Sequence, residues 1–152
     1  MKTYLSQKDY DFIYSRVPRV CVDLVILSTK GLLLSKRKIE PNYGMWHLPG
    51  GRIFIHEKVA DAVQRIAKNE LNVKVQIDSF IGYIEYLKEI RKATQNHSLS
   101  LVFKLKVKSG TLKGNSQTQE IKFFSKLPKN IIPEQLVFLK QQSKLKLFKK
   151  NG

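Results

Sequence analysis

The stretch Gly50–Val73 reads GGRIFIHEKVADAVQRIAKNELNV and places two glycines ahead of a segment with helical periodicity. Its apolar residues recur at intervals of three and four, which predicts a helix from about Val59 to Leu71. Glycines let a backbone turn tightly and approach a ligand closely. Positions 66 and 70 lie one helical turn apart, and only Glu70 supplies a carboxylate there. On spacing alone, Glu70 suits either a cation ligand or a solvated position on the helix surface.

The residues before this stretch predict two strands and a loop. Val20–Ser28 is β-branched and apolar, and a Thr-Lys-Gly turn separates it from Leu32–Arg37, so we expect a β-hairpin. Prolines and glycines recur through 38–51, which indicates a loop that ends in the sequence Trp46–Gly51, WHLPGG.

The residues after the central helix predict more strands. Val73–Tyr86 is typical of a strand, with an interruption near Asp78, and Arg91–Ser98 is polar enough to predict a loop. Apolar and polar residues alternate within Leu99–Lys108, which indicates a half-buried strand, and Ile121–Phe124 predicts a short one.

Helices are expected near both ends of the chain, over residues 4–15 and over 135–148, where the second is amphipathic and ends in basic residues. Strands, a central helix, further strands and a terminal helix predict an α/β sandwich with a mixed sheet. With 152 residues, 42% of them hydrophobic, we expect one domain over residues 1–152.

Composition limits the cellular setting and the partners. Cys21 is the only cysteine, so no disulfide can form within the chain. The N-terminus lacks the apolar core of a signal peptide, and no apolar run approaches a membrane span, so we expect a cytoplasmic protein without a membrane partner. The net charge of +16 favours anionic partners such as nucleotides or nucleic acid, although scattered lysines also suit solvated surfaces.

The glycine–helix stretch resembles the signature box of the Nudix family, G-x5-E-x7-R-E-U-x-E-E-x-G-U, in which U is a bulky apolar residue. The matching positions are Gly51, Glu57, Arg65, Glu70 and Val73. The preceding WHLPGG is also typical of Nudix proteins. The resemblance implies the Nudix fold, an α/β/α sandwich with a central mixed sheet, and a Glu57–Arg65 pair that braces the loop against the helix.

The box over residues 51–73 departs from this pattern at four positions, which are Ile66, Ala67, Asn69 and Asn72. An apolar residue after the arginine and a non-acidic residue before the last glutamate are similar to the GDP-mannose mannosyl hydrolases. The Lys36-Arg37 pair and the sequence P-G-G-R also match that subfamily. The resemblance covers roughly residues 4–127.

This resemblance implies a Mg²⁺ site, with Mn²⁺ as an alternative, formed by the Gly50 carbonyl, Glu70 and Gln117. The hard oxygen atoms of these groups suit such ions. The position of Gln117 comes from the short match S-Q-T-Q-E-I-K-F-F.

Four further residues receive roles from the same resemblance. Arg37 and Arg52 would face the diphosphate, where a guanidinium can make bidentate contacts, or else be solvated surface cations. Asp23 would lie near the leaving group or the sugar. His97 matches a strand histidine with a substrate-binding or a structural role.

The general base of these hydrolases is a histidine that follows the glutamine, and Thr118 occupies that position here. Threonine cannot accept a proton near neutral pH, so the role is empty unless another group fills it. Glu120 is the candidate substitute, with a solvated loop carboxylate as the alternative. His56 lies within the box loop and is expected to be exposed, and His47 receives no role.

Two classes of function follow. The first is a Mg²⁺-dependent Nudix hydrolase that cleaves a nucleoside diphosphate sugar, similar to GDP-mannose, into nucleoside diphosphate and sugar; a variant of it attacks phosphorus. The second is a weakened Nudix domain that binds a nucleotide or RNA through its positive charge. We rank the enzyme first and RNA as the less favoured partner. A homodimer is the assembly that the resemblance implies.

Overall fold

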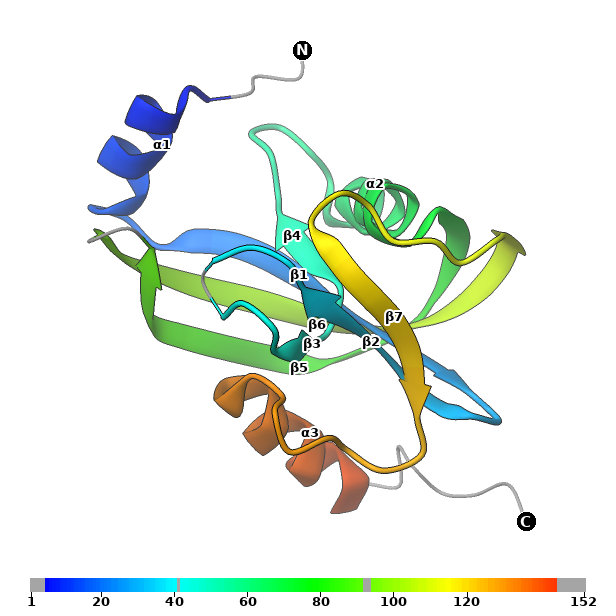
Figure 1. Cartoon of the computed structure of the whole chain (residues 1–152). Helices are drawn as coiled ribbons and strands as arrows, with labels where there is room; N and C mark the ends of the chain where they lie inside the picture. Colours follow the sequence, from blue (N-terminus) through cyan, green and yellow to red (C-terminus); the bar gives the residue numbers. More distant parts are fainter. Residues whose placement is uncertain (1–4, 41, 92–93, 145–152) are drawn as a thin grey trace.

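A mixed β-sheet with a helix on each face forms the centre of the molecule (Figure 1). The computed structural model describes residues 5–40, 42–91 and 94–144. In chain order the elements are α1 (Gln7–Tyr14), β1 (Arg19–Ser28), β2 (Gly31–Arg37), β3 (Trp46–His47), β4 (Gly50–Arg52), α2 (Val59–Leu71), β5 (Val73–Arg91), β6 (Thr94–Gly110), β7 (Thr118–Phe124) and α3 (Pro133–Lys144).

The sheet has the strand order β3-β2-β1-β6-β5, with β4 paired to β1 and β7 paired to β2. Strands β1 and β6 run parallel, and the other pairings are antiparallel. Strand β1 meets β2 only at their hairpin end, and over Cys21–Asp23 it pairs instead with β4. This divergence brings the paired glycines into the sheet beside Asp23.

Alternation along β1 divides the core into two layers. Val22, Leu24 and Ile26 pack with the buried face of α2, whereas Val25 packs with the cluster on the α3 side. Because successive side chains of a strand point to opposite faces, Asp23 lies on the face away from α2. Figure 1 shows α2 and α3 on opposite sides of the sheet, which confirms the predicted α/β/α sandwich.

Helix α2 spans the predicted residues and explains two departures of the box. Ile66 is 2% exposed and belongs to the α2 core cluster, so its apolar side chain serves packing. Asn72 ends the helix with φ 58° and ψ 34°, in the left-handed region that asparagine tolerates in place of glycine. Its side-chain amide donates to the Thr111 carbonyl at 3.1 Å.

The predicted loop over Arg91–Ser98 is wrong. Strand β5 continues to Arg91 and β6 begins at Thr94, so the two strands form one long hairpin. Polarity misled the prediction because Asn96 and Ser98 point into a polar cavity rather than an apolar core. The expected interruption near Asp78 is confirmed as a register shift between Ile77 and Ser79.

The first predicted helix is shorter than expected, because α1 starts after Ser6, whose hydroxyl accepts from the Asp9 amide at 3.1 Å. Helix α3 starts at Pro133, and the predicted end at 148 lies outside the described residues. Among the helices of the described residues, none is long and apolar enough to cross a membrane.

Candidate active site

The loop between β4 and α2 is held by the predicted pair of Glu57 and Arg65. The Arg65 guanidinium donates to both carboxylate oxygens of Glu57, at 2.6 and 2.8 Å, and to the Arg52 carbonyl at 2.8 Å. Glu57 also accepts from the Phe54 amide at 2.9 Å. The bidentate pair therefore ties the loop, the helix and the end of β4 together, and the prediction of this brace is confirmed.

A cavity of about 430 Å³ opens beside this brace. We call it the box cavity, because the Gly50–Arg52 strand and the side chains of Arg65, Asn69 and Glu70 line it, together with residues 115–117. Burial raises the pKa of Glu70, while the Asn115 hydrogen bond and the Arg37 charge act in the opposite direction. The Asn115 amide donates to Glu70 Oε1 at 3.0 Å, so this carboxylate faces a polar, partly enclosed space.

Gly50 leaves no room for a side chain. A Cβ atom at this position would lie 2.3 Å from Asp23 Oδ1 and 2.6 Å from the Val22 carbonyl oxygen. The close approach is possible only for glycine, and it brings the backbone that borders the box cavity against the Asp23 carboxylate.

The donor set of the box cavity fits a divalent cation only with help from a ligand. Within residues 5–40, 42–91 and 94–144, no three histidine, cysteine or acidic side chains gather as a metal site. Glu70 and Gln117 line the cavity with the Gly50 backbone, so the hard oxygens include one carboxylate. Mg²⁺ is commonly bound by one or two carboxylates plus substrate phosphates, and these residues fit that arrangement.

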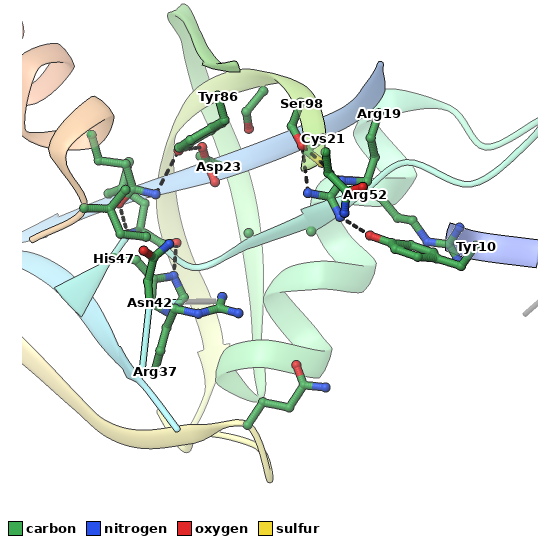
Figure 2. Close-up of a pocket in the computed structure, with 18 residues that line it drawn as sticks. Tyr10, Arg19, Cys21, Asp23, Arg37, Asn42, His47, Arg52, Tyr86 and Ser98 are labelled. Atoms are coloured by element: carbon green, nitrogen blue, oxygen red, sulfur yellow. Dashed lines mark hydrogen bonds between the residues drawn. The ribbon is translucent and has the colours of Figure 1, made fainter. Parts of the chain in front are cut away.

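A second cavity, of about 280 Å³, lies on the sheet face away from α2. We call it the sheet cavity, because alternate residues of β1 and β6 line it (Figure 2). It shares Gly50, Gly51, Arg52 and Gln117 with the box cavity. The two cavities therefore adjoin along β4.

A chain of buried hydrogen bonds fixes Asp23 in the sheet cavity. The Leu48 amide donates to Gln135 Oε1 at 2.6 Å, and Gln135 Nε2 donates to the Tyr86 hydroxyl at 2.9 Å. The Tyr86 hydroxyl in turn donates to Asp23 Oδ2 at 2.8 Å. Asp23 is 7% exposed, so α3 orients a nearly enclosed carboxylate through Gln135.

Arginines and aromatic rings form another side of the sheet cavity (Figure 2). The Arg52 guanidinium lies 5.3 Å from the centroid of the Tyr10 ring and 5.1 Å from that of Phe54, and it donates to the Tyr14 hydroxyl at 3.3 Å. Arg19 donates to Ser98 Oγ at 2.7 Å and to the Tyr10 hydroxyl. Helix α1 thus packs its tyrosines against the cationic groups of the cavity.

The structure brings together six of the predicted site residues around the two cavities, and they are Asp23, Arg37, Gly50, Arg52, Glu70 and Gln117. His97 follows Asn96 on β6 and lines neither cavity, and Glu120 is exposed on β7 and also lines neither. The Thr118 hydroxyl donates to Asn115 Oδ1 at 3.2 Å. The roles of His97 and Glu120 stay predictions.

Several cavity residues were missed by the sequence reasoning, and they are Tyr10, Arg19, His47, Asn96, Ser100 and Gln135. The alternation of polar residues at 96, 98 and 100 is a signal that could have revealed a polar strand face. Arg19 and Gln135 have no local signal, because only the tertiary fold brings them to the cavity.

Comparisons with known proteins agree with this architecture. A family model described as NUDIX domain matches residues 17–145. The chain is 34% identical over 125 residues to the low-salt glycan biosynthesis protein Agl8 of Haloferax volcanii, with 80% of each chain covered. It is 37% identical over 114 residues to the ADP-ribose pyrophosphatase of Methanocaldococcus jannaschii, covering 74% of this chain and 66% of that protein.

Solved structures show the same fold. The MutT NUDIX hydrolase of Burkholderia pseudomallei matches with a TM-score of 0.73 and 26% identity, over 83% of this chain and 98% of that one. The MutT protein of Methanosarcina mazei matches with a TM-score of 0.74 at 18% identity, over 87% of this chain and 98% of that one, and supports the fold alone. The chain belongs to the Nudix hydrolase family. The predicted fold and family are therefore confirmed, whereas the subfamily stays a prediction.

His47 is a partly buried, neutral member of the sheet cavity. Its Nδ1 lies 2.7 Å from the Leu48 carbonyl oxygen, and because a carbonyl only accepts, Nδ1 carries the proton. Burial and the charge of Arg37 lower the pKa of His47 from 6.5 to about 4. At neutral pH the ring therefore offers Nε2 as an acceptor.

We expect His47 to make folding sensitive to mild acid. Its pKa is lower in the folded than in the unfolded chain, so stability is present above pH 6.5 and is lost as the pH falls toward 4. This difference corresponds to about 3 kcal/mol of the free energy of unfolding. Urea unfolding between pH 4 and 7.5 should show a loss smaller by that amount in His47→Asn than in wild type. His56→Asn, at an exposed position, is the control, and matching profiles for all three proteins would contradict the assignment.

Proposed function

We propose that the protein hydrolyses a nucleoside diphosphate sugar, with the diphosphate in the box cavity and the sugar in the sheet cavity. The observation that carries this proposal is the junction of the two cavities at Gly50–Arg52 and Gln117. One side of the junction holds the Glu70 carboxylate, and the other holds a buried polar surface around Asp23. A cation held at Glu70 would bind an anionic group, and the polar surface would bind an uncharged polar group, so a nucleoside diphosphate sugar suits both sides.

The names of the relatives support the same substrate class. One relative functions in glycan biosynthesis, and another is named for ADP-ribose, which is itself a nucleoside diphosphate joined to a sugar. Arg37 and Arg52 line the sheet cavity near the junction, where guanidinium groups can bind the diphosphate. The overall charge of +16 favours the encounter with an anionic substrate.

Glu70, the Gly50 carbonyl and Gln117 would hold a divalent cation, Mg²⁺ or Mn²⁺, against the diphosphate. When bound, such an ion withdraws charge from the phosphoryl oxygens and so improves the leaving group. The Arg65–Glu57 brace keeps the Gly50–Arg52 backbone at the edge of this site. The identity of the sugar and the base, a cytoplasmic location and a homodimer stay predictions.

Water attack at the anomeric carbon is the reaction that the sheet cavity favours. The water oxygen bonds to the sugar carbon, the C–O bond to the diphosphate breaks, and nucleoside diphosphate leaves with the bonding electrons. Asp23 accepts the water proton, because it is the carboxylate that lines the sheet cavity and the Tyr86 hydrogen bond orients it. Before it accepts this proton, the ionised carboxylate also stabilises positive charge that develops on the sugar ring.

Attack at phosphorus is the second candidate, and the similarity to an ADP-ribose pyrophosphatase favours it. The same two cavities would hold the substrate, but water would add to phosphorus and release nucleoside monophosphate and sugar phosphate. Ile66 and Asn69 replace carboxylates of the box, which weakens the support for this chemistry.

We expect Mg²⁺-dependent turnover of GDP-mannose or ADP-ribose. The reaction is run in ¹⁸O-labelled water, and the products are analysed by phosphorus NMR. With GDP-mannose, whose diphosphate is bonded to the anomeric carbon, nucleoside diphosphate without label supports attack at carbon, whereas label in a phosphate supports attack at phosphorus. ADP-ribose tests attack at phosphorus alone, because its diphosphate is not bonded to the anomeric carbon. Glu70→Gln should abolish the Mg²⁺-dependent turnover. Glu85→Gln, at an exposed position on β5, should leave this turnover unchanged. Absence of turnover on any nucleoside diphosphate sugar, with salt-sensitive RNA binding instead, would replace the enzyme by the binding module.

We expect Asp23→Asn to lower kcat by about 10²–10⁴-fold with little change in KM, because an amide cannot accept the water proton. The amide oxygen can still accept from Tyr86, so the fold should persist. Glu120→Gln is the matched variant, since it makes the same change at an exposed residue outside both cavities. A large loss of kcat in Glu120→Gln and none in Asp23→Asn would transfer the role of base to Glu120.

A further inference from the structure

We infer that Asn96, Ser98 and Ser100, on one face of β6, form a recognition surface for the hydroxyl groups of a neutral sugar. This inference rests on the proposed function and names the part of the substrate that the sheet cavity binds. The three side chains line the cavity at alternate positions of the strand and therefore point to the same side.

The surface contains polar atoms that the described part of the protein leaves without partners. Asn96 is 2% exposed and Ser100 is fully buried, yet Asn96 Oδ1 and Ser100 Oγ have no hydrogen-bond partner among the described residues. Native structures contain few such groups, because a buried polar atom that is left unpaired destabilises the fold. Both residues line the sheet cavity, so a ligand in that cavity lies next to the side chains that carry these atoms.

The chemistry of these atoms selects the ligand. An amide oxygen only accepts, so Asn96 Oδ1 needs a donor, which an ionised phosphate or carboxylate does not have. A hydroxyl group donates and accepts, and it therefore suits both Asn96 and Ser100. Ser98 is already engaged by Arg19, at 2.7 Å, and this contact holds a cation at the edge of the surface.

Ser35 provides a natural comparison within the chain. Its Oγ is also buried without a partner, and the residue is 1% exposed, but it lines neither the box cavity nor the sheet cavity. Ser35→Ala and Ser100→Ala thus remove the same buried, unpaired hydroxyl from two places, of which only one faces the proposed sugar. Neither change should lower the melting temperature, because removal of an unpaired buried hydroxyl relieves its desolvation cost.

The test compares the binding of GDP-mannose with GDP, of ADP-ribose with ADP, and of UDP-glucose with UDP-glucuronate. Calorimetric titration is done with Ca²⁺ in place of Mg²⁺, since Ca²⁺ takes oxygen ligands and turnover must be kept low. In wild type, the sugar should improve affinity by about five- to tenfold over the nucleoside diphosphate for at least one pair. Ser100→Ala should remove most of this gain and leave the Kd of the nucleoside diphosphate within about twofold.

The outcomes separate the inference from the proposed function. Ser35→Ala should bind all ligands as wild type does, and a shared loss in both variants would overturn the inference as a packing effect. Equal affinity of wild type for sugar nucleotide and nucleoside diphosphate, or tighter binding of UDP-glucuronate than of UDP-glucose, would also overturn it, while turnover could still support the hydrolase. If no nucleoside diphosphate binds, the proposed function fails first, and the inference fails with it.

Discussion

The bidentate hydrogen-bonded ion pair of Arg65 with Glu57 is the interaction on which the site depends. One guanidinium joins Glu57 in the loop to the Arg52 carbonyl at the end of β4. A single side chain of α2 therefore holds the loop and the end of β4 in place against the helix. Both partners of the ion pair are largely buried, with side-chain exposures of 17% and 14%. Loss of one partner from such a pair costs more than the pair contributes, because the other charge is left without compensation. The junction of the two cavities is built on this anchored segment.

Around that anchor, the site keeps groups that folding alone does not favour. Burial disfavours the ionised form of Glu70 and the protonated form of His47, and Ser100 retains a hydroxyl without a partner. In each case the surroundings of the group lower the stability of the fold, and such unfavourable groups are expected where a protein binds or reacts with a ligand. These three groups line the two adjoining cavities, and a common ligand would explain their retention there, whereas Ser35 shows that an unpaired buried hydroxyl also occurs outside both cavities.

Local patterns predicted the architecture better than the site. Periodicity is enough to place α2, since its core face is apolar, and the Nudix resemblance supplied the Glu57–Arg65 brace. The polar strand around Asn96 was misread as a loop, because alternation normally signals an apolar inward face and here that face borders a cavity. The partners of Asp23 come from β5 and α3, so Tyr86 and Gln135 could be found only once the chain was folded.

The eroded box then has a structural explanation that bears on function. A Cβ atom built on Gly51 would lie 3.3 Å from the Ile66 side chain, which packs in the α2 core, so this position contributes packing where the family has a carboxylate. The proposed cation site has Glu70 as its carboxylate among the residues that line the box cavity. An ion held by one carboxylate and neutral oxygens gains much of its affinity from the phosphates of the ligand. In the proposed site, binding of cation and substrate would therefore be coupled, and by linkage each would strengthen the other to the same degree.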